Sequence, residues 1–178
     1  MQGKMKFKQN QQGYTLIEMM VAVVVLGVIL AIAVPSFNAM IKNTQIRTAA
    51  ESVSNGLLKA RAEAISRNTN VTFVLGAGTS WSIRQVSGNV LIESRASKEG
   101  SADVTLTAVD AAVAAATTVT FNSLGGIVAT NADASLPIAQ VDFTTTGGDR
   151  DLRVEIGAGG RIKMCDPNLT SGSSPRAC

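Results

Sequence analysis

The feature that most constrains this chain is an uncharged apolar run near its N-terminus. Between Glu18 and Lys42 there is no charged side chain, which leaves 23 consecutive residues, Met19 to Ile41, that are uncharged and mostly apolar. An α-helix rises about 1.5 Å per residue, so this run is long enough to cross a bilayer. We therefore predict a membrane-spanning helix over residues 14–41.

Glu18 lies at the start of this run, where a carboxylate is costly to place in lipid. An ionisable group at such a position is a functional candidate by default. We expect its partner to be a cation from another chain.

The residues around this run resemble a type IV prepilin. They comprise a short basic leader that ends in Gly13, then Tyr14, Thr-Leu-Ile-Glu18, the apolar run, and Pro35 near its end. In that family a prepilin peptidase cuts after the glycine and methylates the new N-terminal amine. The resemblance implies cleavage between Gly13 and Tyr14 and methylation of Tyr14, where the family usually has phenylalanine.

Two further roles follow from the same resemblance. In the family the glutamate pairs with the N-terminus of a neighbouring subunit during filament assembly, and the proline kinks or locally melts the helix. The resemblance therefore implies assembly roles for Glu18 and Pro35, with other pilins as partners.

An ordinary secretory signal or a plain signal anchor is the alternative. Neither needs a carboxylate at the head of its apolar run, and Pro35-Ser36-Phe37 is a poor signal cleavage site. The leader lysines, Lys4, Lys6 and Lys8, predict a cytoplasmic N-terminus with the rest of the chain on the other side of the membrane. The resemblance implies that this membrane is the bacterial inner membrane, that the globular domain is periplasmic, and that the protein then enters the pilus filament or its tip.

The charge balance limits what the rest of the chain can do. The formal net charge is +3, but without the three leader lysines 13 basic residues face 13 acidic ones. A nucleic-acid role therefore needs a local patch. The chain has no histidine, which excludes histidine metal sites and Ser-His-Asp triads. No motif groups the remaining residues into a catalytic site, so we predict neither enzymatic activity nor a cofactor or metal.

Beyond residue 41 the apolar residues change from a continuous run to a helical stripe. The stripe consists of Ile46, Ala50, Val53, Leu57, Ala60 and Ala64. This spacing predicts that residues 42–68 form the amphipathic half of the same helix, with one face lying on a sheet. The whole helix is predicted to run from about Tyr14 to about Ser66.

The remaining residues, 69–178, are predicted to form an antiparallel β-rich domain. The predicted fold class is therefore α+β, with a long N-terminal helix packed on a C-terminal sheet domain. Strands are predicted at 71–75, 81–86, 89–95, 118–122, 126–129, 138–144, 152–156 and 161–165. Ser87-Gly88 suits a tight hairpin, and the alanine-rich residues 108–116 are predicted to be a loop. Trp81 suits the core, against Leu57 or Ala60, better than a base-stacking platform.

Two short segments carry a finer resemblance. Phe121-Asn122-Ser123-Leu124-Gly125 and the terminal Gly160-Arg161-Ile162-Lys163-Met164-Cys165-Asp166-Pro167 resemble the GspH/FimT group of secretion pseudopilins and minor pilins. The C-terminal segment is most similar to FimT minor pilins, some of which bind DNA through a Gly-Arg-x-Arg motif. That motif maps to Gly160, Arg161 and Lys163, with lysine in place of the second arginine.

Arg161 and Lys163 are two apart on a predicted strand, so they project from the same side. Two adjacent cations suit contacts to DNA phosphates without sequence preference. Arg150, Arg153 and Arg176 could widen this patch. The carboxylates that would oppose it are Asp149, Asp151, Glu155 and Asp166. The alternative is a solvated strand face with mixed charges.

Cys165 and Cys178 lie in the part of the chain predicted to be outside the cytoplasm, where an oxidised pair is favoured over two free thiols. A bond between them would close a loop of about 14 residues, worth on the order of 3 kcal/mol. It would also hold Arg176 beside the strand of Arg161 and Lys163.

The resemblance implies two competing functions. The first is a minor pilin of a type IV pilus that contributes to assembly and to DNA binding and uptake in natural transformation. The second is a GspH-type minor pseudopilin of a type II secretion system, without DNA affinity.

Overall fold

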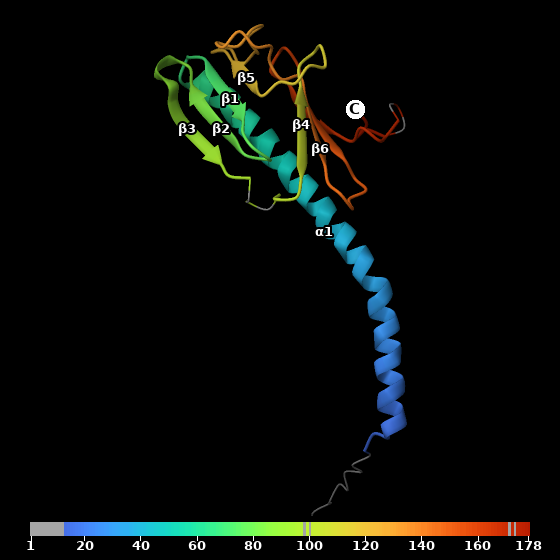
Figure 1. Cartoon of the computed structure of the whole chain (residues 1–178). Coiled ribbons are helices and arrows are strands. Elements are labelled where there is room, and N and C mark those ends of the chain that lie inside the picture. Colours follow the sequence, from blue (N-terminus) through green and yellow to red (C-terminus); the bar gives the residue numbers. More distant parts are fainter. Residues whose placement is uncertain (1–12, 98, 100, 171, 173) are drawn as a thin grey trace, which may run out of the picture. The chain divides into compact units, whose positions relative to one another are not determined.

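The computed structural model describes residues 13–97, 99, 101–170, 172 and 174–178. Residues 1–12, the predicted leader apart from Gly13, lie outside this described part. The chain divides into two compact units, Met1–Phe37 and Asn38–Cys178. Helix α1 (Leu16–Ser66) supplies residues to both units (Figure 1).

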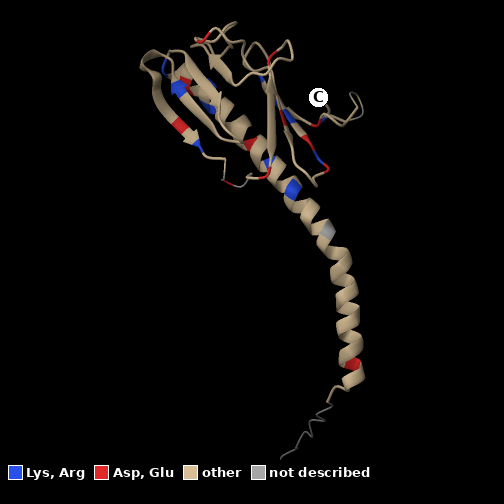
Figure 2. Ribbon diagram, viewed as in Figure 1, with Lys and Arg blue, Asp and Glu red and all other residues tan. Residues whose placement is uncertain are grey.

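The first unit contains residues 14–37 of the predicted membrane-spanning helix, and residues 38–41 belong to the second unit. Its described side chains from Leu16 to Val34 are all exposed, and α1 is long and apolar enough to cross a membrane. The helical assignment continues through Pro35 without a break. So large an apolar surface, tan in Figure 2, needs lipid or other apolar chains to cover it.

In the second unit, one face of α1 is completely buried. The helix residues with no exposed surface are Ile46, Ala49, Ala50, Val53, Leu57, Ala60 and Ala64. All six residues of the predicted stripe are among them, so the amphipathic prediction is confirmed. Every described core residue lies between Ile46 and Ala177. Because Asn38–Cys178 thus carries its own core, we expect this unit to fold without the residues before it.

Two antiparallel sheets accompany this helix (Figure 1). The first has the order β3-β2-β1-β5 and contains β1 (Val71–Leu75), β2 (Trp81–Gln85), β3 (Val90–Arg95) and β5 (Thr118–Phe121). The second has the order β4-β6-β7-β8 and contains β4 (Thr105–Val109), β6 (Gln140–Thr144), β7 (Leu152–Ile156) and β8 (Ile162–Cys165). The predicted fold, a long N-terminal helix packed on antiparallel sheets, is confirmed.

Trp81 is buried in the core, as its sequence context predicts. Its ring centroid lies 5.6 Å from that of Phe73, and its indole Nε1 donates a hydrogen bond to Ser52 Oγ on α1 at 2.9 Å. Gly56 lets the helix approach these rings, because a Cβ atom there would lie 2.8 Å from Phe73 Cε2. The indole therefore packs on α1 and is not available for base stacking.

One predicted strand is absent from the structure. Residues 126–129 form no strand, only an isolated bridge between Phe121 and Ile127. The cause is the preceding turn: Asn122 Oδ1 accepts hydrogen bonds from the N–H groups of Leu124 and Gly126. After that turn the N–H of Ile127 bonds to Ala158 O instead of extending a ladder.

The second error concerns the alanine-rich stretch. Ala108 and Val109 were predicted to be loop but belong to β4, where they pair with Val141 and Gln140 of β6. The predicted hairpin around Ser87-Gly88 is confirmed: β2 and β3 pair antiparallel, with Gln85 opposite Val90, and the short 3₁₀ turn η1 (Ser87–Asn89) joins them. The register shifts between Ile83 and Arg84.

Two loops hold the start of α1 in the second unit, and we call this set of contacts the helix clamp. Lys42 Nζ lies 2.7 Å from Asp103 Oδ2, and Asn43 Nδ2 donates to Asp149 Oδ1 at 2.6 Å. Thr145 Oγ1 donates to Asp103 O at 2.7 Å, which ties the two loops together. The clamp therefore contacts α1 at Lys42 and Asn43, directly after the uncharged run ends.

The clamp predicts a pH-dependent contribution to stability. The hydrogen bond from Lys42, and then its positive charge, lower the pKa of the Asp103 carboxyl below its usual range. A lowered folded-state pKa stabilises the protein above the ordinary carboxyl pKa, and this stability is lost as the pH falls through the folded value. Asp103→Asn should thus lower the urea midpoint of residues 38–178 at pH 7, and the difference from the parent should shrink as the pH falls below the ordinary carboxyl pKa and through the lowered folded-state value.

The matched control is Glu51→Gln, which removes the exposed ion pair with Arg47 inside the helix alone. It should change the midpoint less than Asp103→Asn does. A difference between Asp103→Asn and the parent that stayed constant from pH 7 to acid would contradict the clamp.

Candidate functional site

The predicted processing and assembly residues lie together at the N-terminal end of the described chain. Gly13 and Tyr14 precede α1 in a segment without helix, and both are exposed, Tyr14 by 81%. The bond between them therefore lies in an accessible stretch outside the helix. The backbone N–H of Glu18 bonds to Thr15 Oγ1 at 3.3 Å, the usual contact of a helix N-cap.

Glu18 thus has a local role within the chain as well as the predicted one. A carboxylate in the first turn interacts favourably with the helix dipole. Its side chain is nevertheless exposed beside apolar residues, which leaves its charge free for a cation from another subunit.

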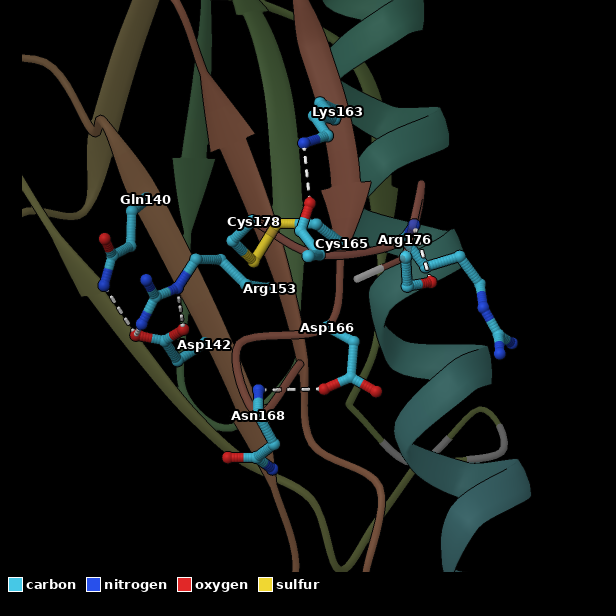
Figure 3. Close-up of a disulfide and its surroundings, with 11 residues drawn as sticks. Gln140, Asp142, Arg153, Lys163, Cys165, Asp166, Asn168, Arg176 and Cys178 are labelled. Carbon is cyan, nitrogen blue, oxygen red and sulfur yellow. Dashed lines mark hydrogen bonds and ion pairs between the residues drawn. A yellow bond between two sulfur atoms is a disulfide. The ribbon is translucent and has the colours of Figure 1, made fainter. Parts of the chain in front are cut away.

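At the other end of the chain, residues 174–178 form a short segment that we call the C-terminal arm. A disulfide joins Cys165 at the end of β8 to Cys178 (Figure 3). The N–H of Asp166 donates to Arg176 O at 2.7 Å, and Asp166 and Ala177 form a parallel bridge. Ala177 is buried as a result. The arm is therefore held to β8 by one covalent bond and by backbone pairing.

Lys163 is not the solvated cation that its sequence position predicts. Its Nζ donates a hydrogen bond to Ala177 O at 2.9 Å, and its side chain is partly buried (Figure 3). The ammonium group is thus used to hold the C-terminal arm. Its charge has no carboxylate in ion-pair contact among the described residues.

Arg153 does not extend the predicted patch as a free cation. Its Nε lies 2.6 Å from Asp142 Oδ1 on β6, and its Nη2 lies 3.3 Å from Oδ2. Gln140 Nε2 also donates to Asp142 at 2.7 Å (Figure 3). This two-point contact neutralises the guanidinium, so Arg153 offers little to a phosphate.

The other three predicted cations remain exposed. Arg150, Arg161 and Arg176 have no ion pair with a carboxylate among the described residues. In Figure 3 the Arg176 side chain extends away from the disulfide. By contrast, the cations paired with carboxylates are Lys42, Arg47, Lys59, Arg67, Arg95 and Arg153. Arg150, Arg161, Lys163 and Arg176 thus lie in the last 30 residues without an ion pair, in a stretch that also contains Asp149, Asp151, Glu155 and Asp166.

The four carboxylates expected to oppose this patch also form no ion pair among the described residues, and the hydrogen bonds given for three of them come from neutral groups. Asp149 bonds to Asn43, Asp151 accepts from Asn168, and Asp166 accepts from the backbone N–H of Asn168. Glu155 lies beside the disulfide, with its carboxylate and both sulfur atoms within 4.8 Å of one another. Because the two sulfurs are bonded to each other, this group offers no thiolates to a metal ion.

Sequence reasoning overlooked Arg61, on α1, which lies where two distant loops meet. Its Nε donates to Gly125 O at 2.9 Å. Gly160 packs against the same carbonyl so closely that a Cβ atom there would overlap it. The two segments that carry the finer resemblance, 121–125 and 160–167, are thus in contact. Helical periodicity alone gives no sign of this, since Arg61 merely flanks the buried stripe.

Family models match two parts of the chain. Residues 8–34 match the prokaryotic N-terminal methylation motif, and residues 49–176 match the family of the type II transport protein GspH. No protein of curated function matches the chain in sequence.

Solved structures with a similar fold include two proteins. The type IV minor pilin FimU of Pseudomonas aeruginosa is 22% identical, with a TM-score of 0.48, over 75% of this chain and 94% of FimU. The minor pseudopilin EpsH of the Vibrio cholerae type 2 secretion system is 15% identical, with a TM-score of 0.51, over 70% of this chain and 99% of EpsH. At this identity EpsH supports the fold alone.

The geometry of the C-terminal arm predicts a local effect of its disulfide. In the parent, alkylation without reductant should label no thiol. Cys178→Ser should speed tryptic cleavage after Arg176, because that carbonyl is held by Asp166 and the next residue is buried. The free energy of unfolding should fall by less than the roughly 3 kcal/mol of the chain-entropy estimate, since the sheets keep their contacts.

Cleavage after exposed Arg150, outside the arm, is the internal control and should keep its rate. Equal rates of cleavage after Arg176 in the parent and in Cys178→Ser would show that the arm is not held as described.

Proposed function

Because the chain belongs to the family of the type II transport protein GspH, we propose that it is a minor pilin that joins a type IV pilus and binds DNA there. In this proposal a prepilin peptidase cuts between Gly13 and Tyr14 and methylates Tyr14. The apolar half of α1 anchors the protein in the inner membrane, with its N-terminus in the cytoplasm and its globular domain in the periplasm. The protein then enters a filament with other pilins, through Glu18 and the apolar helix around Pro35.

The exposed apolar half of α1 is the observation that supports assembly into a filament. Its described side chains from Leu16 to Val34 are exposed, and Glu18 is the charged residue among them. In a filament, helices of other subunits would bury this surface, and Glu18 would need a cation there. The free amine of Tyr14 on a neighbouring subunit has the required charge.

Assembly should therefore depend on the carboxylate. Glu18→Val should leave cleavage intact, so that N-terminal sequencing still begins at Tyr14, but should remove the protein from sheared filament fractions. Glu51→Gln, which also removes one carboxylate, is the control and should assemble like the parent. Normal incorporation of Glu18→Val would refute a role for this charge.

DNA binding is proposed from the exposed guanidinium groups near the C-terminal arm. Arg161 and Arg176 are exposed without carboxylate partners, and the disulfide keeps the arm that carries Arg176 against β8. Lys163 contributes its charge while it holds the arm through Ala177 O. These cations suit phosphate contacts, which position DNA without reading its sequence. Uptake of DNA in natural transformation is the function we assign to this contact.

The competing proposal is a minor pseudopilin of a type II secretion system, without DNA affinity. The same fold and apolar helix would serve it equally well. The disulfide-held arm and the unpaired arginines favour the pilus, since a pseudopilin has no need of a phosphate-binding surface.

A DNA titration separates the two. Residues 38–178 should bind duplex DNA weakly, with little sequence preference and with affinity falling as salt rises. Arg161→Gln combined with Arg176→Gln should remove most binding at low salt and make the slope of log affinity against log salt shallower by about 1.8, as expected for two lost phosphate contacts.

Arg47→Gln is the single-charge control, because Arg47 is neutralised by Glu51; it should bind like the parent. A double variant that bound like the parent would eliminate this patch. A parent without measurable binding would favour the secretion pseudopilin.

A further inference from the structure

Arg61 is one of the described cations of the domain that lack an acidic partner. Its Nε is bonded to a neutral carbonyl, Gly125 O, at 2.9 Å, and it forms no ion pair among the described residues. The side chain is partly buried. Arg61 therefore places a positive charge without an acidic partner near the C-terminal end of α1, which ends at Ser66.

This charge lies next to the motif that contains Arg161. Arg61 Nε is 3.1 Å from the position that a Cβ atom of Gly160 would occupy. Gly160 is the residue before Arg161, and consecutive Cα atoms are about 3.8 Å apart. Gly160 also has a φ of +76°, which favours glycine. The glycine of the Gly-Arg-x-Lys motif thus makes room for a second guanidinium from α1.

The geometry also leaves Arg61 able to bind. A guanidinium has five N–H donors, and the contact with Gly125 uses the one on Nε. The terminal Nη groups carry the other four donors and form no hydrogen bond given by the structure among the described residues. Because Nε is already fixed, a ligand would not have to restrain the whole side chain, which reduces the entropic cost of binding.

We propose that Arg61 is a second phosphate-binding residue, which acts beside Arg161 on the backbone of duplex DNA. The planar fork of the guanidinium suits two oxygens of one phosphate. This inference rests on the proposed DNA binding. In this proposal the DNA-binding surface extends from Arg161, beside β8, across Gly160 and Gly125 to Arg61 on α1.

The test uses a substitution that removes the charge and keeps the structural contact. In Arg61→Gln, the glutamine Nε2 is bonded to Cδ as the arginine Nε is, so it can still donate to Gly125 O. The terminal charged groups are lost. Arg61→Lys keeps the charge and is the conservative variant, and Arg47→Gln removes a neutralised cation from the same helix.

The measurement is fluorescence anisotropy of a labelled DNA duplex with residues 38–178, over a range of salt concentrations. Arg61→Gln should weaken binding on the order of tenfold at about 50 mM salt and make the salt slope shallower by about 0.9, the value for one phosphate. Arg61→Lys should keep a slope close to that of the parent. Urea midpoints of all variants, measured in parallel, should stay close to that of the parent.

The remaining outcomes of this experiment have distinct meanings. If Arg61→Gln binds like the parent while Arg161→Gln is weakened, the role of Arg61 is wrong and the proposed function stands. If Arg61→Gln and Arg47→Gln lose affinity equally, net charge alone accounts for binding and the site is refuted. If the parent binds no DNA, the proposed function fails, and the role of Arg61 fails with it.

Discussion

The structure of the globular unit depends on one constraint, the burial of a helix face made largely of small residues. Alanine at four positions of the buried face and glycine at position 56 keep α1 thin on this side, so that aromatic side chains such as Phe73 and Trp81 pack directly on it. Each large apolar side chain buried in this way contributes about 1.5 to 3 kcal/mol. Before Pro35 the same helix presents exposed side chains that are apolar apart from Glu18. One element therefore supplies the core of the domain and an apolar surface that only lipid or other chains can cover.

The distribution of charge follows from this arrangement. Where cations lie along the sheets and the helix, most have a carboxylate within ion-pair distance, for example Lys42 with Asp103 and Arg153 with Asp142. Lys163 and Arg61 are instead held by neutral carbonyls, those of Ala177 and Gly125. A carbonyl fixes a cation without cancelling its charge. Both side chains are therefore held in place while their charge stays unpaired.

Periodicity in the sequence was sufficient to predict the helix, its buried stripe and most strands, because those patterns reflect burial on one face. It failed where a single side chain or a distant segment decides the path of the chain. The side chain of Asn122 accepts hydrogen bonds from two backbone N–H groups of its own turn, and this turn ends the strand pairing after β5. Lys163 was expected in solvent, but the disulfide brings a backbone carbonyl to it. Arg61 could not be found, since its neighbours Gly125 and Gly160 are 64 and 99 residues away in the sequence.

The helix clamp has a mechanical consequence. If the apolar part of α1 is anchored and the filament is pulled, tension passes along the helix to residues 42 and 43, where Asp103 and Asp149 hold it from two loops. Thr145 links those loops, so a pull on the helix would reach both loops together. The globular unit would then receive tension through these two loops.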